Sequence, residues 1–176
     1  MLNIIGCIDT PTSGSVEIDD VATAVLDDNT LTRLRRDKIG TVFQFFNLLP
    51  TLTVGENVAL PLVLQRRPRD EVARRVARVL ERVELGNKRD KYPATISGGE
   101  MQRAAVARAI IHEPSIVLAD EPTGNLDSVR GDLVLALLRE IATSGQTIVM
   151  ATHSLEAASR ADRRIHLRDG HIERIS

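Results

Sequence analysis

The chain has 176 residues, of which 43% are hydrophobic, 27% are charged and 2% are aromatic, and its formal net charge is −1. This balance is typical of one globular domain, and the weak charge and scarcity of aromatic rings argue against a nucleic-acid partner. The single cysteine excludes an internal disulfide framework and a cysteine-based zinc site. No apolar run reaches the roughly 20 residues of a membrane-spanning helix.

The N-terminal part of the chain predicts short elements that precede one buried strand. The apolar run 1–5 is too short to form an independent helix or strand, and residues 15–18 alternate in polarity like a strand. Asn29 or Thr30 is expected to cap the helix that follows. Residues 39–43 then form an apolar strand.

Two helices are predicted in the middle of the chain. Apolar residues at helical spacing after Thr53 indicate the first helix, and residues 68–85 form the clearest amphipathic pattern, with Gly86 as a candidate C-cap. The stretch 66–91 is the most basic part of the chain. Acidic side chains are interleaved with its arginines, which favours a solvated helix face over a nucleic-acid patch.

The remainder of the chain alternates between helices and strands. Leu133 is expected to face inward from its helix, and the last two strands to form a hairpin around Asp169 and Gly170. The predicted elements are helix 100–111, strand 116–119, helix 128–143, strand 147–151, helix 155–161 and strands 164–167 and 172–175. Continuous apolar strands separated by helices predict an α/β fold with a parallel sheet that is covered on both faces.

Two carboxylates directly follow the strand at 116–119. Side chains alternate along a strand, so Asp120 and Glu121 are expected to point to different sides where the strand leaves the sheet. Open α/β sheets bind ligands at this edge, where one carboxylate can hold Mg²⁺ and another can polarise an attacking water. Taken alone, the pair is also compatible with a carboxylate that only caps a helix.

A second candidate site is the sequence Ser97-Gly98-Gly99 at the start of a helix. Adjacent glycines allow backbone N–H groups to approach a ligand closely, and a helix N-terminus favours an anion. The alternative is a simple N-cap by Ser97. Small alanine side chains further along would let this helix pack closely against the sheet.

Five motifs in order resemble those of the ATP-binding subunits of ABC transporters. ISGGEMQR at 96–103 resembles the signature motif, and IVLADE at 116–121 resembles Walker B with its catalytic glutamate. NLD at 125–127 resembles the D-loop, Gln44 in TVFQFFNLLP the Q-loop, and His153 in VMATHS the switch histidine. Two segments, FNLLPTLTVGENVALPL and LADEPTGNLDS, are most similar to those of the lipoprotein-release, macrolide-export and cell-division branch of the family.

The resemblance implies a role for each motif residue. Glu121 and His153 are expected to orient the water that attacks the γ-phosphate of ATP, so they are the predicted catalytic residues. Asp120 and Gln44 are expected to lie near Mg²⁺. The predicted nucleotide-binding residues are Gln44, Ser97, Gly98, Gly99, Glu100 and Asp127. Taken singly, Gln44 would be a surface residue, His153 a cap or core residue, and Asp127 the cap of the next helix.

The resemblance also implies an architecture and partners. The fold is expected to be of the P-loop NTPase type (RecA-like), with a core at 1–43 and 110–176 and an inserted helical subdomain at 44–109. ATP and Mg²⁺ are the expected cofactors, and a membrane permease and a second ATP-binding subunit are the expected partners. The chain would lie in the cytoplasm, peripheral on the inner face of the plasma membrane. Its helix at 53–65 would dock the permease and couple ATP hydrolysis to export or extraction.

The chain departs from the family pattern in one respect, because it contains no G-x-x-x-x-G-K-[ST] sequence. That loop cradles the phosphates of ATP, so the N-terminal strands and the P-loop are expected to be missing and ATP binding to be poor. One alternative is a non-catalytic remnant or regulatory partner that contributes only the signature surface. A DNA-repair-type ABC ATPase is disfavoured, because the stretch between Gln44 and Ile96 has no room for a long coiled coil and no cysteines.

Overall fold

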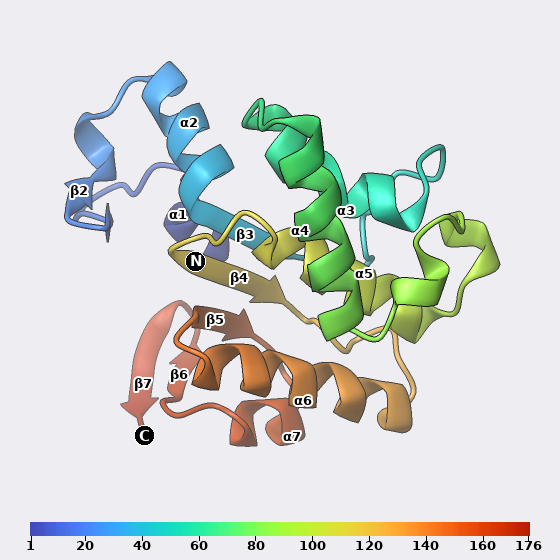
Figure 1. The fold of residues 1–176 in the computed structure, drawn as a ribbon. Helices are drawn as coiled ribbons and strands as arrows, with labels where there is room; N and C mark the ends of the chain where they lie inside the picture. The colour runs from blue at the N-terminus through green and yellow to red at the C-terminus, as the bar shows by residue number, and fades with distance from the viewer.

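The computed structural model describes all residues from 1 to 176, and three parallel strands form its centre (Figure 1). These strands are β3 (Ile39–Val42), β4 (Ile116–Asp120) and β5 (Thr147–Ala151), in the order β3-β4-β5. Val42 pairs with Ala119, and Ala119 pairs with Met150. The parallel sheet with intervening helices confirms the predicted α/β class.

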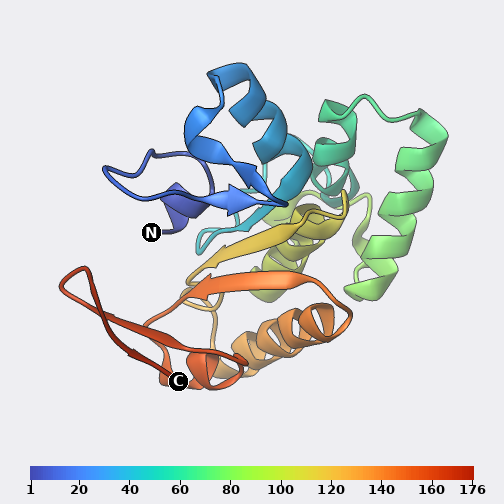
Figure 2. The same cartoon turned by 90° about the vertical axis from the view of Figure 1, so that its left-hand side faces the viewer.

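Elements from both ends of the chain flank this sheet. The N-terminal ones are α1 (Leu2–Ile5), β1 (Glu17–Ile18), β2 (Val21–Ala22), the 3-10 helix η1 (Thr23–Val25) and α2 (Asp28–Lys38). The C-terminal ones are α7 (Leu155–Ser159) and the antiparallel hairpin of β6 (Ile165–Arg168) and β7 (His171–Ile175). Figures 1 and 2 both show this hairpin beyond β5, on the side of the molecule away from α3 and α4.

Four further helices complete the fold. They are α3 (Val54–Leu64), α4 (Arg69–Arg82), α5 (Gly98–Ile110) and α6 (Ser128–Thr143), with the 3-10 helices η2 (Gly86–Lys88) and η3 (Pro93–Thr95) between α4 and α5. Thr53 and Ser97 begin α3 and α5 with complete capping boxes, in which Glu56 and Glu100 bond back to the cap backbone. None of these helices is both long enough and apolar enough to span a bilayer.

The two faces of the sheet carry different parts of the core. Val42, Val117 and Ala119 lie on one face and belong to a cluster of 21 buried residues built with α3, α4, α5 and α6. Ile39 and Leu118 alternate onto the other face and join a cluster of five buried residues that includes side chains of α2 and of the segment after α1. Most of the core therefore lies on the face that α5 covers.

Several expected boundaries are corrected by the structure. The run 1–5 does form a single helical turn, and strand 15–18 is reduced to two residues. The cap of α2 is Asp27 rather than Asn29 or Thr30, because Asp27 Oδ1 accepts a 2.7 Å hydrogen bond from the backbone N–H of Thr30. Asn29 and Thr30 therefore lie within the first turn of the helix.

The end of α4 and the buried stripe of α6 also differ from expectation. Gly86 is not the C-cap, since Glu84 takes the left-handed conformation (φ 57°) and Leu85 N–H bonds the carbonyl of Leu80 at 2.8 Å. Leu133 is 51% exposed rather than buried. The inward stripe of α6 consists of Val134, Leu135, Leu137, Leu138 and Ile141.

Candidate functional site

Three predicted site residues follow the C-terminal ends of the three parallel strands. Gln44 lies two residues after β3, Glu121 directly after β4, and His153 two residues after β5. Because parallel strands end at the same edge, the structure brings these residues to one edge of the sheet, where open α/β sheets bind their ligands. The arrangement supports the roles that the resemblance implies, which stay predictions.

Glu121 has a strained backbone that the surrounding structure holds in place. Its φ is 42°, a left-handed value that costs a non-glycine residue about 1–3 kcal/mol. Its N–H donates to the carbonyl of Ala151 at 2.9 Å, and its carbonyl accepts from the N–H of Gly124 at 3.0 Å. Strain that is held in this way is common at functional sites, so it agrees with a catalytic assignment.

The carboxylate of Glu121 binds the loop that follows β5. Oε2 accepts from the Thr152 hydroxyl at 3.0 Å, and Oε1 accepts from the backbone N–H of His153 at 2.7 Å. The same Oε1 lies 2.7 Å from Nδ1 of the His153 ring. An ionised carboxylate only accepts hydrogen bonds, so Nδ1 carries a proton in this pair.

This pairing leaves the other ring nitrogen of His153 available. The His153 side chain is 83% exposed, whereas that of Glu121 is 21% exposed. The imidazole is thus oriented by Glu121 at Nδ1 and presents Nε2 to solvent, where it can hydrogen-bond a ligand. A base held by a carboxylate in this manner has the geometry of an oriented general base or electrostatic partner.

Asp120 is the exposed last residue of β4, and its carboxylate makes no hydrogen bond or ion pair. Carboxylate oxygens are the ligands that Mg²⁺ prefers, and Mg²⁺ is commonly bound by one or two carboxylates together with phosphate oxygens and water. No cluster of three or more His, Cys, Asp or Glu side chains is suited to a metal in this chain. The exposed Asp120 carboxylate fits the predicted role of a Mg²⁺ ligand.

Gln44 is packed against the turn that follows β4. Asn125 Nδ2 donates to the backbone carbonyl of Gln44 at 2.9 Å, and Gln44 Nε2 lies 3.4 Å from Asn125 Oδ1. A Cβ added to Gly124 would lie 2.8 Å from Gln44 Nε2, so it would displace the amide end of the Gln44 side chain. The remaining oxygen of the Gln44 amide is free to contact a metal or water.

The Ser97-Gly98-Gly99 segment forms the first turn of α5. Ser97 Oγ accepts from the backbone N–H of Glu100, and Glu100 Oε2 accepts from the backbone N–H of Ser97 at 2.7 Å. Lys88 adds an ion pair to the other oxygen of Glu100 at 3.2 Å. The N-cap alternative for Ser97 is thus realised, and the first-turn N–H groups of Gly98 and of the buried Gly99 have no acceptor within the helix.

Glu100 uses both carboxylate oxygens within the chain, which gives a pH-dependent prediction. The hydrogen bond from Ser97 N–H, with the ion pair to Lys88, lowers the pKa of Glu100 to about 2. A lowered pKa stabilises the fold above about pH 4.5, and that stabilisation is lost as the pH falls through about 2. Glu100→Gln should therefore reduce the free energy of unfolding at pH 7 by about 1–2 kcal/mol.

Urea denaturation of the wild type and of Glu100→Gln at pH 7, 4 and 2.5 measures this effect. The difference in the free energy of unfolding should shrink as the pH falls below about 4.5, because the carboxylate is then protonated in the unfolded wild type while it stays largely ionised in the folded one. A difference that stays constant over this range would contradict the assigned cause.

Asp127 caps α6 and lies beside the start of α5. Its Oδ1 accepts from the backbone N–H of Arg130 at 3.0 Å, which lowers the pKa of Asp127, and its Oδ2 pairs with the Arg130 guanidinium at 2.9 Å. A Cβ on Gly99 would contact the Arg130 side chain at 3.2 Å, and one on Gly98 would contact Leu126 at 3.5 Å. The predicted residues Ser97–Gly99 and Asp127 thus lie at the neighbouring starts of α5 and α6.

The structure adds site residues that the sequence motifs did not identify. Thr152 orients Glu121, and its oxygen also accepts from the N–H of Ser154 at 3.1 Å. Arg108 donates to the backbone carbonyls of Phe46 and Asn47, and its burial lowers its pKa. In sequence, Arg108 was a polar residue in an otherwise Ala- and Val-rich buried helix, which was an available signal.

Comparisons with known proteins agree with this geometry. A family model described as ABC transporter matches residues 1–124. An uncharacterized ABC transporter ATP-binding protein, MJ0796 of Methanocaldococcus jannaschii, is 47% identical, over 99% of this chain and 76% of its own length. The macrolide export ATP-binding/permease protein MacB of Brucella melitensis is 44% identical over 98% of this chain, which spans 27% of that longer protein.

A solved structure is similar over the whole chain. It is the dimeric, post-hydrolysis state of the ATP-binding cassette MJ0796 bound to ADP and Pi, with a TM-score of 0.88 and 46% identity. It covers 100% of this chain and 78% of its own chain. Both the fold class and the family resemblance seen in the motifs are confirmed. This chain belongs to the ABC transporter family and has the fold of its ATP-binding cassettes.

Proposed function

We propose that this chain is the ATP-hydrolysing subunit of a transporter, which couples hydrolysis to export or extraction of a substrate through a membrane permease. The observation that carries the proposal is the Glu121–His153 pair at the sheet edge, with a 2.7 Å contact and one exposed ring nitrogen. Bound MgATP supplies the phosphoryl group and the metal charge. The cytoplasmic face of the membrane is the location that this function requires.

Each residue of the candidate site has a proposed role in hydrolysis. Glu121 orients the attacking water and accepts its proton, a role worth about 10²–10⁴ in rate for a positioned base. When its ring is protonated, His153 would donate Nε2–H to a phosphate oxygen while Nδ1–H donates to Glu121. Asp120 and Gln44 supply oxygen ligands on the Mg²⁺ side of the site.

The partner in hydrolysis is proposed to be a second ATP-binding subunit. The half-buried Gly98 and the buried Gly99 form the start of α5 beside Asp127, and anions bind well at such helix starts. Each of the two sites of a dimer would combine Glu121 of one chain with Ser97–Gly99 of the other. The dimeric state of the MJ0796 cassette supports this arrangement.

A mixing experiment tests hydrolysis and site sharing together. Glu121→Gln and Gly99→Asp chains are each expected to release little phosphate from MgATP. Random pairing makes about half of the dimers mixed. Each mixed dimer combines an unchanged Glu121 with an unchanged Ser97–Gly99 segment at one of its two sites, so the equimolar mixture should regain roughly a quarter of wild-type activity. A mixture that stays inactive although it dimerises would contradict shared sites, and a wild type that releases no phosphate would contradict hydrolysis and favour a non-catalytic subunit.

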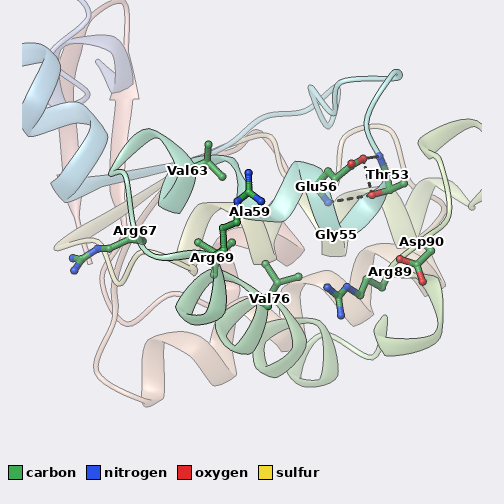
Figure 3. A pocket seen from close by; sticks show the side chains of 12 residues that line it. Thr53, Gly55, Glu56, Ala59, Val63, Arg67, Arg69, Val76, Arg89 and Asp90 are labelled. Carbon is green, nitrogen blue, oxygen red and sulfur yellow. Dashed lines mark hydrogen bonds between the residues drawn. The ribbon is translucent and has the colours of Figure 1, made fainter.

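The permease is proposed to dock on a groove between α3 and α4. This groove has a volume of about 560 Å³, with apolar walls that include Ala59 and Val76. Figure 3 shows Arg67 at one end of the groove and Glu56 and Asp90 toward the other. The fusion of an ATP-binding part and a permease part in MacB supports a permease partner of this kind.

Cysteine cross-linking tests this docking site. The one natural cysteine, Cys7, is buried, so a cysteine introduced at the surface should be the one that reacts. Val63→Cys, at a groove residue that is 56% exposed, should cross-link to a co-expressed permease in membranes. Leu133→Cys, at a 51% exposed residue of α6, is the matched control and should not. Equal cross-linking at both positions would contradict the groove as the docking site.

The division of the chain into a core at 1–43 and 110–176 and a helical subdomain at 44–109 is part of the proposal. It is supported by the placement of α3 and α4 to one side of the sheet in Figure 1. The second boundary falls one residue before the end of α5, which packs on both α3 and β3.

A further inference from the structure

Gln102 is a polar side chain in the centre of the core. It lies on α5, one turn after Ser97-Gly98-Gly99, and its exposed fraction is 0%. Its Nε2 donates two hydrogen bonds to backbone carbonyls, one to Phe43 at 3.2 Å and one to Pro122 at 2.7 Å. Burial of an amide is unfavourable unless it is hydrogen-bonded, so these two bonds explain how this position tolerates a glutamine.

The orientation of the amide follows from its partners. Both neighbours are carbonyl oxygens, which only accept, so the NH₂ group must face them. Its Oε1 is buried and has no partner. The NH₂ group of Gln102 therefore donates both hydrogen bonds, and an acceptor in its place would repel both carbonyls.

The two carbonyls belong to the residues next to two predicted site residues. Phe43 immediately precedes Gln44, and Pro122 immediately follows Glu121. One side chain thus joins the backbone at the end of β3 to the backbone at the end of β4. The bond to Pro122 also holds the turn that keeps Glu121 at φ 42°.

The same side chain connects this edge of the sheet to the start of α5. The capping box of Ser97 and Glu100 makes the first turn of α5 rigid, and Gln102 lies in the turn that follows. A shift of the Gly98–Gly99 backbone along the helix axis would therefore change the two Gln102 bonds directly. No other side chain of α5 bonds the backbone at both strand ends.

We propose that Gln102 is a positioning residue that sets the placement of Gln44 relative to Glu121 and ties both to the helix start at Ser97–Gly99. It touches neither nucleotide nor water and acts through the backbone. The consequence for hydrolysis rests on the proposed function, whereas the positioning itself is a property of the fold. Binding of a ligand at Gly98–Gly99 would in this way change the placement of Glu121 in the same chain.

Hydrogen exchange measured by mass spectrometry tests the positioning without nucleotide. In Gln102→Leu, which keeps the bulk and removes both bonds, peptides covering 41–47 and 119–126 should exchange about tenfold faster. Val106→Ala is the matched control, since Val106 is one turn further on α5, is 0% exposed and makes no side-chain hydrogen bond. Val106→Ala should lower the Tm without a selective increase in the hydrogen-exchange rate of peptides 41–47 and 119–126.

The variant Gln102→Glu supplies a second readout. A protonated carboxyl can donate one hydrogen bond to a carbonyl, but an ionised one donates none. Relative to wild type at the same pH, the protection of 41–47 and 119–126 should be lost at pH 8 and partly regained at pH 5.5. Gln102→Leu should show no such recovery.

Phosphate release links the positioning to hydrolysis. In Gln102→Leu, kcat for MgATP should fall about tenfold with KM changed less than about twofold, because the catalytic geometry and not the binding of nucleotide is disturbed. Faster exchange spread evenly over the molecule, or the same two-segment pattern in Val106→Ala, would overturn the proposal. If the wild type releases no phosphate, the proposed function fails, and the exchange data alone then support or overturn the role of Gln102.

Discussion

Glu121→Gln is expected to lower phosphate release from MgATP by about 10²–10⁴ while leaving the fold intact. The amide has nearly the shape of the carboxylate, so its oxygen can still accept from the N–H of His153, and its NH₂ can face the hydroxyl of Thr152. It cannot take a proton from water at neutral pH. The loss should therefore appear in kcat rather than in stability.

Stopped or coupled phosphate assays over a range of MgATP concentrations measure this change, and urea denaturation checks the fold. Glu113→Gln is a suitable control, because the Glu113 side chain is 79% exposed and makes only a 3.6 Å ion pair with Arg75. It should retain wild-type kcat. A Glu121→Gln protein with kcat within a few-fold of wild type would show that another group activates the water.

Gly40→Ala is expected to have the largest effect on stability of any single methyl addition. Gly40 lies in β3, and a Cβ there would overlap the backbone carbonyl oxygen of Ala109 in α5. Backbone atoms cannot move aside as a flexible side chain can, so the helix and the strand must separate. The free energy of unfolding should fall by about 3 kcal/mol or more, as for severe overpacking.

Gly131→Ala is the matched control for this prediction. Gly131 lies inside α6, and its added Cβ would meet only Thr123, at an ordinary contact distance of 3.5 Å. Alanine is the better helix former, so this variant should be up to about 1 kcal/mol more stable than wild type. Urea denaturation of both variants decides the matter, and equal stabilities for the two would contradict the close approach of β3 and α5.

The Gly40 contact also bears on the candidate site. β3 delivers Phe43 and Gln44 to the sheet edge, and α5 carries Gln102, which bonds the carbonyl of Phe43. A wider spacing between β3 and α5 would lengthen that bond. Gly40→Ala is therefore also expected to speed hydrogen exchange at 41–47 in any folded protein that remains.

Much of the site was predictable from the sequence, because its residues directly follow strands. The apolar runs before Gln44, Asp120 and His153 identified three buried parallel strands, and such strands end together at one edge. Ser97 and Asp127 were also recognisable as candidate caps, because each is a residue type that favours the N-cap and directly precedes a helical pattern. These local rules also explain why the bounds of α6 and β5 were predicted correctly.

Other features depended on contacts between distant segments. The cap of α2 and the end of α4 were misplaced because several residues compete for each position, and the packing of the helix decides between them. The exposure of Leu133 was likewise decided by which stripe of α6 meets the core. Hydrophobic periodicity alone does not centre that stripe to within one residue.

The sequence by itself determined the family and the parallel sheet, because ordered motifs and apolar strands that alternate with helices encode them, and it supplied the predicted catalytic residues Glu121 and His153. Only the tertiary structure decided how those motifs meet. It placed Thr152 and His153 on the carboxylate of Glu121, Asn125 on Gln44, and the Gln102 amide between Phe43 and Pro122. The physical reason is that these hydrogen bonds join segments far apart in the chain, and no local pattern specifies such partners.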